Sequence, residues 1–440
     1  MKQITAPNEK VIAFIKTNSP ETEGLRPALW AVPYSRDGVN LMKNTFSGEI
    51  VQLSDEELAA PERVEELVKR RFVVPADYDE AEKYLETVKL IRLMQPEKPG
   101  LRTYTILPTT ACNARCTYCY EEGYRVSTMT QETAERLVDF ICETRCDDKI
   151  TLAWFGGEPT VCAKTISFIC RELEKRGVPF RSRMITNASL ITRELAHEIK
   201  EVWRLKKVQV SLDGDRRDYT QRKRYIDPVR HNYDTVMRAV HYLADEDIRV
   251  NLRVNFDRDS IGRLRLFLDE MENEFGENKN VTLYLAALYQ EKPKPYFIEL
   301  ERQMHELKRY IDELGINSIE RENLGTSFRL NSCMADSLDK SIVIQPDGSF
   351  FDCEHLPAGH SWGNIFDGVT DQELFDRLSA PAEPDAKCRV CPFLPMCTPF
   401  YKHGCPGWFE SCREFQHLST EYQLDKLARK LSAGQEASHD

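Results

Sequence analysis

Three cysteines stand close together, as Cys112, Cys116 and Cys119, in the run Cys-Asn-Ala-Arg-Cys-Thr-Tyr-Cys. The chain has 14 cysteines, none before Cys112 and seven from Cys333 onward. A structural zinc site takes four protein ligands, and an electron-carrying cubane iron–sulfur cluster takes four cysteines. Three thiolates from one loop therefore predict a cluster with one iron left open for chemistry. The alternative is zinc completed by a distant histidine, which the 9 histidines, none of them nearby, disfavour.

The elements that would position this loop alternate along residues 101–315. The predicted strands are Thr103–Pro108, Ile150–Phe155, Arg183–Thr186, Lys207–Leu212, Arg249–Asn255 and Val281–Leu288. The first predicted helix is capped by Thr130 and runs through Cys142. The other predicted helices are Ala163–Lys175, Arg193–Val202, Tyr233–Leu243, Ile261–Phe275 and Pro295–Leu314. This alternation implies an α/β fold with a parallel sheet. Six units predict an open, partial TIM-like barrel, since a closed one needs eight, with its chemistry at the carboxyl ends of the strands.

Three more motifs end the next strands. They are Gly156-Gly157-Glu158-Pro159, Thr186-Asn187-Ala188 and Ser211-Leu212-Asp213-Gly214. The glycines permit close backbone approach, and Glu158 or nearby carbonyls could accept hydrogen bonds from an ammonium group. Asn255 is a candidate for the pocket lining or, alternatively, a core residue satisfied by backbone. The basic run Arg216–Arg224 is predicted to be a solvated loop face.

The cysteine run resembles the signature of the radical S-adenosylmethionine (SAM) superfamily, CxxxCxxC with an aromatic residue before the third cysteine. The later motifs are similar to that family's GGEP, TNG and SxDG, in the same order, over roughly residues 101–290. The resemblance implies that the three cysteines hold a [4Fe–4S] cluster whose open iron binds SAM. Reduction then releases a 5′-deoxyadenosyl radical. The residues implied to contact SAM are Tyr118, Gly156, Gly157, Glu158, Asn187, Ser211, Asp213, Lys223 and Asn255.

The chain departs from the family pattern at two of these motifs. Ala188 stands where the family has glycine, so a positive φ is not expected there. The family often has an arginine, pairing with the SAM carboxylate, where this chain has Lys223. Lysine keeps the positive charge but loses the bidentate fork. Arg222 and Arg224 are possible substitutes.

Residues 316–440 contain few elements beyond a hairpin, Ser341–Gln345 with Ser349–Asp352, and a final helix, Ser419–Leu431. Their cysteines suit two zinc ribbons or, by resemblance, the SPASM extension of peptide-modifying radical SAM enzymes. That resemblance implies one fully ligated auxiliary cluster and a second with no fourth cysteine. The two ligand sets are Cys388, Cys391, Cys397 and Cys412, and Cys333, Cys353 and Cys405. Seven residues separate Cys397 from Cys405 where the family usually has three, which predicts a bulged loop. Cys142, Cys146, Cys162 and Cys170 are interpreted as ordinary buried thiols.

Residues 1–98 are predicted to form a winged-helix-like α+β domain ahead of a core at 99–315. Leu29–Pro33 and Gly48–Leu53 read as strands, followed by small helices. The domain weakly resembles the elements that dock leader peptides, where a leader strand would add to the edge of one of these strands. A structural cap on the barrel is the alternative.

Composition excludes several classes of function. The net charge of −11 disfavours nucleic acid as a partner. No apolar run approaches the roughly 20 residues of a membrane span, and no secretory signal is evident, so the protein is predicted to be cytoplasmic.

The family resemblance implies the cofactors and partners: SAM, three iron–sulfur clusters and a flavodoxin- or ferredoxin-type electron donor. It implies a maturase that crosslinks a ribosomally made precursor peptide with a leader, through a thioether of the sactionine or ranthionine type or another crosslink. The alternatives are an anaerobic sulfatase-maturating enzyme making formylglycine and a zinc-ribbon binding module.

Overall fold

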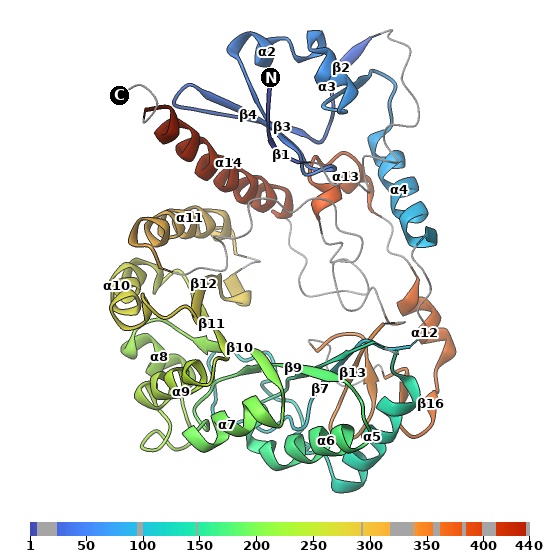
Figure 1. Cartoon of the computed structure of the whole chain (residues 1–440), viewed down its shortest axis with the longest axis vertical. Helices are drawn as coiled ribbons and strands as arrows, with labels where there is room; N and C mark the ends of the chain where they lie inside the picture. Colours follow the sequence, from blue (N-terminus) through green and yellow to red (C-terminus); the bar gives the residue numbers. More distant parts are fainter. Residues whose placement is uncertain are drawn as a thin grey trace. The chain divides into compact units, whose positions relative to one another are not determined.

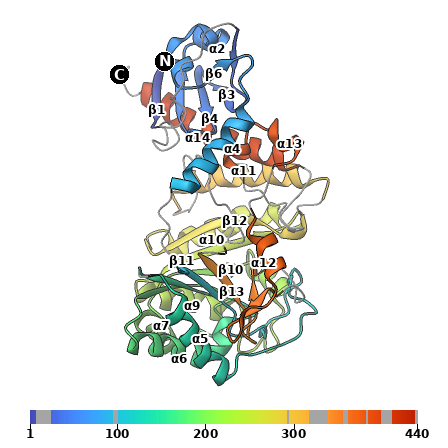
Figure 2. The same ribbon diagram turned by 90° about the vertical axis from the view of Figure 1, so that its right-hand side faces the viewer.

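The computed structural model describes residues 1–6, 24–94, 100–146, 148–291, 294–316, 338, 340–354, 361–380, 384–397 and 411–436. Its contacts gather the chain into two units (Figures 1 and 2). The core unit comprises Lys98–Glu322 and Cys333–Pro381, and the terminal unit comprises Met1–Glu97, Asn323–Ser332 and Ala382–Asp440. Residues 316–440, expected from the sequence to be one domain, therefore contribute to both units.

The core unit is built on an eight-stranded sheet in the order β12-β11-β10-β9-β8-β7-β13-β14. Its strands are β7 Thr103–Ile106, β8 Ile150–Trp154, β9 Phe180–Thr186, β10 Leu205–Leu212, β11 Arg249–Phe256, β12 Val281–Ala287, β13 Ser341–Ile344 and β14 Phe350–Phe351. Strands β7 to β12 are parallel, β13 pairs parallel to β7, and β14 returns antiparallel. The six predicted strands and the parallel α/β fold are confirmed, and the C-terminal hairpin extends the same sheet.

Helices connect the strands, and Figure 1 shows α5, α6 and α7 along one face of the sheet. The core helices are α5 Gln131–Thr144, α6 Ala163–Lys175, α7 Arg193–Glu201, α8 Arg216–Lys223, α9 Tyr233–Asp245, α10 Leu264–Phe275, α11 Phe297–Leu314 and α12 Gln372–Ser379. Thr130 caps α5 as predicted, by accepting a hydrogen bond from the Thr133 backbone N–H. The loop predicted at Arg216–Arg224 is wrong, because Asp215 caps a helix there.

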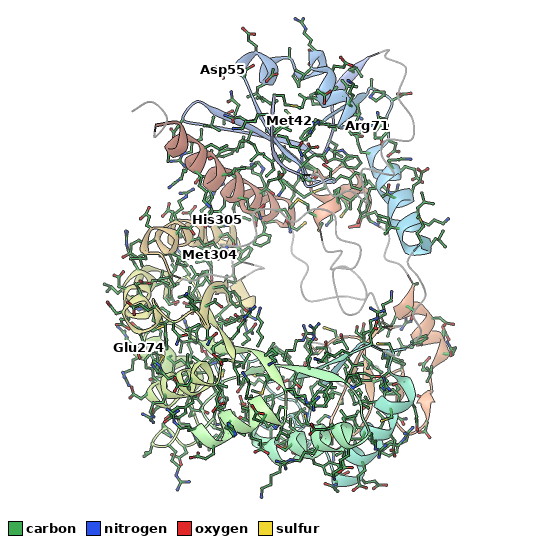
Figure 3. All side chains as sticks on the ribbon, in the orientation of Figure 1. Met42, Asp55, Arg71, Glu274, Met304 and His305 are labelled. Atoms are coloured by element: carbon green, nitrogen blue, oxygen red, sulfur yellow. The ribbon has the colours of Figure 1, made fainter. Side chains whose placement is uncertain are left out.

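Alternation along each strand separates an apolar face of the sheet from a polar one. On β10, Val208, Val210 and Leu212 are fully buried in one apolar core with helix residues. The residues between them point to the opposite side, here named the polar face. Farther along the chain, Met304 on α11 joins the same apolar core, beside His305 (Figure 3). The described helices of the core unit therefore pack on the apolar face of the sheet.

The terminal unit contains a four-stranded antiparallel sheet in the order β1-β5-β4-β3. Its elements are β1 Lys2–Thr5, β3 Ala31–Arg36, β4 Val39–Asn44 and β5 Ile50–Leu53, a pair of strands β2 Leu25–Pro27 and β6 Val73–Pro75, and helices α2 Asp55–Ala59, α3 Glu65–Lys69, α4 Glu80–Met94, α13 Ala386–Arg389 and α14 Cys412–Glu436. Met42 of β4 packs into a cluster with Phe72 (Figure 3). Leu424 and Leu427 of α14 pack on Leu41, so the two ends of the chain share one core.

Two expectations for this unit need correction. Strand β4 follows the turn at Asp37 and Gly38, where no strand was predicted. Gly48–Leu53 cannot offer a free edge for a leader strand, because β5 pairs with β4 on one side and β1 on the other. The other predicted strand, Leu29–Pro33, corresponds to β3, which is an edge strand of this sheet. None of the described helices has the length and apolar content to cross a membrane.

Candidate active site

The three clustered cysteines lie in the loop between β7 and α5, at the carboxyl end of the first strand. Cys112, Cys116 and Cys119 are free thiols, each partly buried. Burial raises the pKa of Cys112 to about 12 and also raises the pKa of the other two thiols. Because a metal binds the thiolate form of cysteine, cluster loading on these residues would be coupled to proton release.

The donor set of this loop fits an iron–sulfur cluster. Its three cysteine thiolates can each bind a different iron of a cubane cluster, which leaves the fourth iron without a protein ligand. The sulfur of Cys112 also receives hydrogen bonds from the Ala114 N–H at 3.4 Å and the Asn187 amide at 3.9 Å. Such bonds favour a thiolate and tune the potential of a cluster.

Gly156 and Gly157 bring the end of β8 directly against the cysteine loop. The Gly157 N–H donates to the Thr109 carbonyl at 3.2 Å, and the Glu158 N–H donates to the Ala111 carbonyl at 2.9 Å. A Cβ on Gly157 would lie 2.5 Å from the carbonyl oxygens of Thr110 and Ala111. Gly156 has a φ of 108°, which an L side chain rarely adopts. The glycines are thus required by the packing of the loop that carries Cys112.

Gly157→Ala is expected to displace the cysteine loop, because the new methyl group cannot avoid two backbone oxygens. We expect a loss of about 1–3 kcal/mol in the free energy of unfolding, as for other overpacked sites, and lower iron content after reconstitution. Gly262→Ala is the matched control, since a Cβ there meets nothing within 4 Å. Urea denaturation and iron analysis of both variants check the prediction, and equal behaviour of the two would contradict it.

The Glu158 side chain connects the ends of β8 and β9 through hydrogen bonds. It is fully buried. One carboxylate oxygen accepts from the Thr160 N–H, the Thr160 hydroxyl and the Thr186 hydroxyl, and the other accepts from the Asn187 N–H at 2.7 Å. A carboxylate with these four donors has little capacity left for a ligand, so it positions the turn after β9. The backbone carbonyls around it remain the better candidates for an ammonium group.

Asn187, which directly follows β9, forms hydrogen bonds with the cysteine loop. Besides reaching the Cys112 sulfur, its amide donates to Asn113 at 2.9 Å. The next residue, Ala188, has a φ of 62°, so the expectation that alanine would avoid positive φ is wrong. The Ala188 N–H donates to the Thr186 hydroxyl at 2.9 Å, and Ser189 bonds the Asn187 side chain. These bonds fix the tight turn despite its backbone strain.

A buried polar network joins the cysteine loop to β10 and β11. The Tyr118 hydroxyl donates to Asp213 at 2.7 Å, and Lys223 donates to the same hydroxyl at 2.8 Å. Lys223 also pairs with Asp213 at 3.3 Å, while the Asn255 amide donates to Asp213 at 2.8 Å. Burial alone would lower the pKa of Lys223, but Asp213 together with the surrounding hydroxyl and thiol groups raises that pKa above its usual value. The network anchors the residue before Cys119 to the strand that carries the SxDG-like motif.

The other residues considered for SAM binding lie in different surroundings from this network. Arg222 is buried and pairs with Asp257 at 2.6 Å, and it donates to the carbonyls of Asp213 and Asn255. Arg224 is exposed beyond the end of α8 and donates to the Gln221 carbonyl. Ser211 is half-buried on the polar face. The structure therefore brings Tyr118, Asp213, Lys223 and Asn255 together as one network, with Ser211 on the neighbouring surface.

The later cysteines divide between the two units. Cys353 follows β14 in the core unit and is half-buried. Cys388, Cys391, Cys397 and Cys412 are half-buried free thiols in the terminal unit. Burial is the main cause that raises the pKa of Cys388, and Asp385, Cys412 and Cys391 add to it. Cys333, Cys405 and the predicted bulge within Thr398–Gly404 lie outside the described residues.

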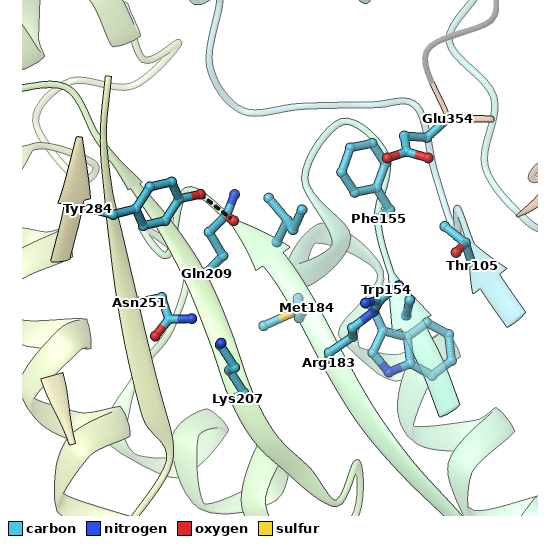
Figure 4. Close-up of a pocket in the computed structure, with 12 residues that line it drawn as sticks. Thr105, Trp154, Phe155, Arg183, Met184, Lys207, Gln209, Asn251, Tyr284 and Glu354 are labelled. Carbon is cyan, nitrogen blue, oxygen red and sulfur yellow. Dashed lines mark hydrogen bonds between the residues drawn. The ribbon is translucent and has the colours of Figure 1, made fainter. Parts of the chain in front are cut away.

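The polar face of the core sheet borders a cavity of about 510 Å³ (Figure 4). Its lining includes Arg183, Lys207, Gln209, Asn251 and Tyr284, all from strand interiors. None of these residues was predicted as a site candidate. The alternation of polar and apolar residues on β9, β10 and β11 is visible in the sequence, but it predicts only a sheet face outside the apolar core.

Several known proteins resemble this chain in sequence or in fold. The Fe-coproporphyrin III synthase of Methanosarcina barkeri is 27% identical over 166 residues, which cover 38% of this chain and only 40% of the synthase. Solved structures with a similar fold include anSMEcpe with bound AdoMet, with a TM-score of 0.56 and 15% identity over 74% of this chain and 99% of that one. Streptococcus suis SuiB bound to S-adenosylmethionine has a TM-score of 0.52 and 14% identity over 88% and 99%. Residues 106–269 match the radical SAM superfamily, so the chain carries a radical SAM domain.

Proposed function

We propose that this protein cleaves SAM reductively and uses the resulting radical to modify a ribosomally made peptide. The observation that carries the proposal is the loop of Cys112, Cys116 and Cys119, held against three neighbouring strand ends in a radical SAM domain. A cluster on these thiols would supply the electron that converts bound SAM to a 5′-deoxyadenosyl radical. The chain itself would orient SAM with Ser211 and the carbonyls around Glu158, while the Tyr118 network keeps the loop in place.

A peptide is the substrate class that the structural relatives support. SuiB has been solved bound to its precursor peptide SuiA, and anSMEcpe with the Kp18Cys peptide. In this chain, edge strand β3 of the terminal unit could add a leader strand, because its outer side pairs with no described strand. Pro33 lies in β3 and has no N–H, so such pairing would be interrupted there.

The modification proposed is an oxidative crosslink that forms a thioether, with electrons passing to auxiliary clusters. Cys388, Cys391, Cys397 and Cys412 would hold one cluster, and Cys353 with Cys333 and Cys405 would hold another. A flavodoxin or ferredoxin would supply the reducing electron. Formylglycine formation on a sulfatase is the second candidate, because the sulfatase-maturase-type fold of anSMEcpe covers 74% of this chain.

Anaerobic reconstitution tests the proposal directly. We expect the purified protein to bind iron and sulfide, to absorb in the visible range, and to form 5′-deoxyadenosine from SAM and dithionite. Incubation with a short peptide encoded beside the gene should then remove two hydrogens from that peptide, measured by mass spectrometry. Zinc alone with no visible absorbance would establish the zinc-ribbon alternative instead. Hydrogen exchange at Cα without mass loss would indicate epimerisation.

A further inference from the structure

Three basic residues stand side by side on the polar face of the core sheet. The β9–β10 register pairs Arg183 with Lys207, and the β10–β11 register pairs Lys207 with Arg249. All three side chains are exposed. Like charges directly opposite each other on neighbouring strands are unfavourable. Water screens part of this repulsion because the side chains are exposed, and a carboxylate bound between them would relieve the rest.

No carboxylate within the described part of the chain neutralises this row. Arg183, Lys207 and Arg249 make no ion pair there, whereas exposed arginines on the helical side do, such as Arg171 with Glu198 at 2.8 Å. The eight strands of the core sheet contain no aspartate or glutamate. Arg181 and Arg253 lie on the same face and add further positive charge. The polar face thus has one sign of charge along its strands.

Two of the three basic residues line the cavity on the polar face. Arg183 and Lys207 line it together with Gln209 and Tyr284, whose side chains are hydrogen-bonded to each other at 2.8 Å (Figure 4). Glu354 lines it too, and Figure 4 shows this carboxylate beside Phe155, away from Lys207. A volume of about 510 Å³ suits a small ligand or a few side chains of an extended segment. A folded domain could not enter it.

We propose that Arg183 and Lys207, supported by Arg249, bind the carboxylate of an acidic side chain in the peptide substrate. The proposal rests on the peptide-modifying function and names the chemistry of the segment that enters the cavity. Arginine binds carboxylates through two parallel hydrogen bonds, and lysine adds a point charge. A long polyanion such as nucleic acid is disfavoured, because the chain as a whole carries a net charge of −11.

The position of the row also predicts where the acidic residue stands in the peptide. Lys207 precedes Ser211 by four residues on β10, which corresponds to about 13 Å along a strand. An extended peptide covers that distance in about four residues. A substrate modified near Ser211 would therefore carry its acidic side chain about four residues from the modified position.

Fluorescence anisotropy of labelled hexapeptides tests the proposal on the reconstituted full-length protein without SAM. Hexaglutamate should bind at low ionic strength and hexaglutamine should not, and added salt should weaken binding through screening. The double variant Arg183→Gln, Lys207→Gln should weaken hexaglutamate binding by roughly tenfold or more, as expected for lost charge-assisted hydrogen bonds. Arg238→Gln, which removes an exposed charge on α9, should leave binding unchanged.

Three results would overturn the proposal. They are equal binding of hexaglutamine and hexaglutamate, undiminished hexaglutamate binding by the double variant, and tighter binding of a hexathymidylate than of hexaglutamate. Failure of the proposed function is recorded separately, as absence of 5′-deoxyadenosine when wild-type protein is incubated with SAM and dithionite, or as no loss of two hydrogens from the co-encoded peptide. The binding measurement and the cleavage measurement therefore fail independently.

Discussion

Replacing Cys112, Cys116 and Cys119 together with alanine is expected to reduce 5′-deoxyadenosine formation to background. The three thiols are the only cysteines in the loop after β7, and without them no cluster can be held beside the proposed SAM site. Iron content should fall by about four atoms per chain, the content of one cubane cluster. Chromatographic analysis of SAM incubated with the variant and dithionite, together with iron analysis, measures both effects.

The matched control uses two other cysteines with the same spacing. Cys142 and Cys146 are four residues apart, like Cys112 and Cys116, but Cys142 lies on α5 and Cys146 is buried just beyond the end of that helix. Their double replacement with alanine should leave SAM cleavage and iron content close to wild type. If the triple variant still cleaves SAM while this control behaves normally, the assignment of the active-site cluster is wrong.

Asp213→Asn is expected to cost about 3–5 kcal/mol in the free energy of unfolding, the usual cost of removing one partner of a buried ion pair. Asp213 is fully buried, and its loss leaves Lys223, which is 2% exposed, without its carboxylate. The Tyr118 hydroxyl would also lose its acceptor, so the cysteine loop should loosen. Urea denaturation of wild type and variant measures the loss, and the cleavage assay should show reduced 5′-deoxyadenosine.

Asp234→Asn provides the comparison, because Asp234 pairs with Arg216 on the exposed surface of the same unit. Exposed pairs contribute about 0–1 kcal/mol, so this variant should unfold almost like wild type. The double variant Asp213→Asn, Lys223→Met should recover part of the lost stability, since it removes the unpaired buried charge. A loss for Asp213→Asn no larger than that for Asp234→Asn would show that the network does not stabilise the loop.

The parallel sheet and its motifs could be predicted because each carries a local signal. Strands such as β10 combine apolar residues at every second position with a glycine-containing turn, and these patterns depend on few distant contacts. The four motifs fall at strand ends, where the topology alone brings them to one edge. Their individual roles could not be predicted in the same way. Whether Glu158 faces a ligand or a neighbouring strand depends on where Thr186 and Asn187 lie, and residue spacing does not reveal this.

The errors have identifiable physical causes. Arg216–Arg224 was expected to be a solvated loop because it is a run of basic residues, but Lys223 and Arg222 are buried there because Asp213 and Asp257 compensate their charges. Ala188 adopts positive φ because hydrogen bonds around Thr186 and Asn187 override its backbone preference. The contribution of residues 382–440 to the terminal unit depends on contacts such as Tyr34 with Asp425, which are remote in sequence. A single sequence contains little information about such pairings.

Strand β13 has a consequence for how the protein is made. It supplies the outer neighbour of β7, yet it lies more than 230 residues later in the chain (Thr103 pairs with Ser341). During synthesis the strand leading into the cysteine loop must wait with one edge unpaired until residue 344 has left the ribosome, and such edges invite aggregation. A chain truncated after Leu314 should therefore be poorly soluble although it keeps every radical SAM motif. Cluster insertion should accordingly follow translation of the C-terminal hairpin.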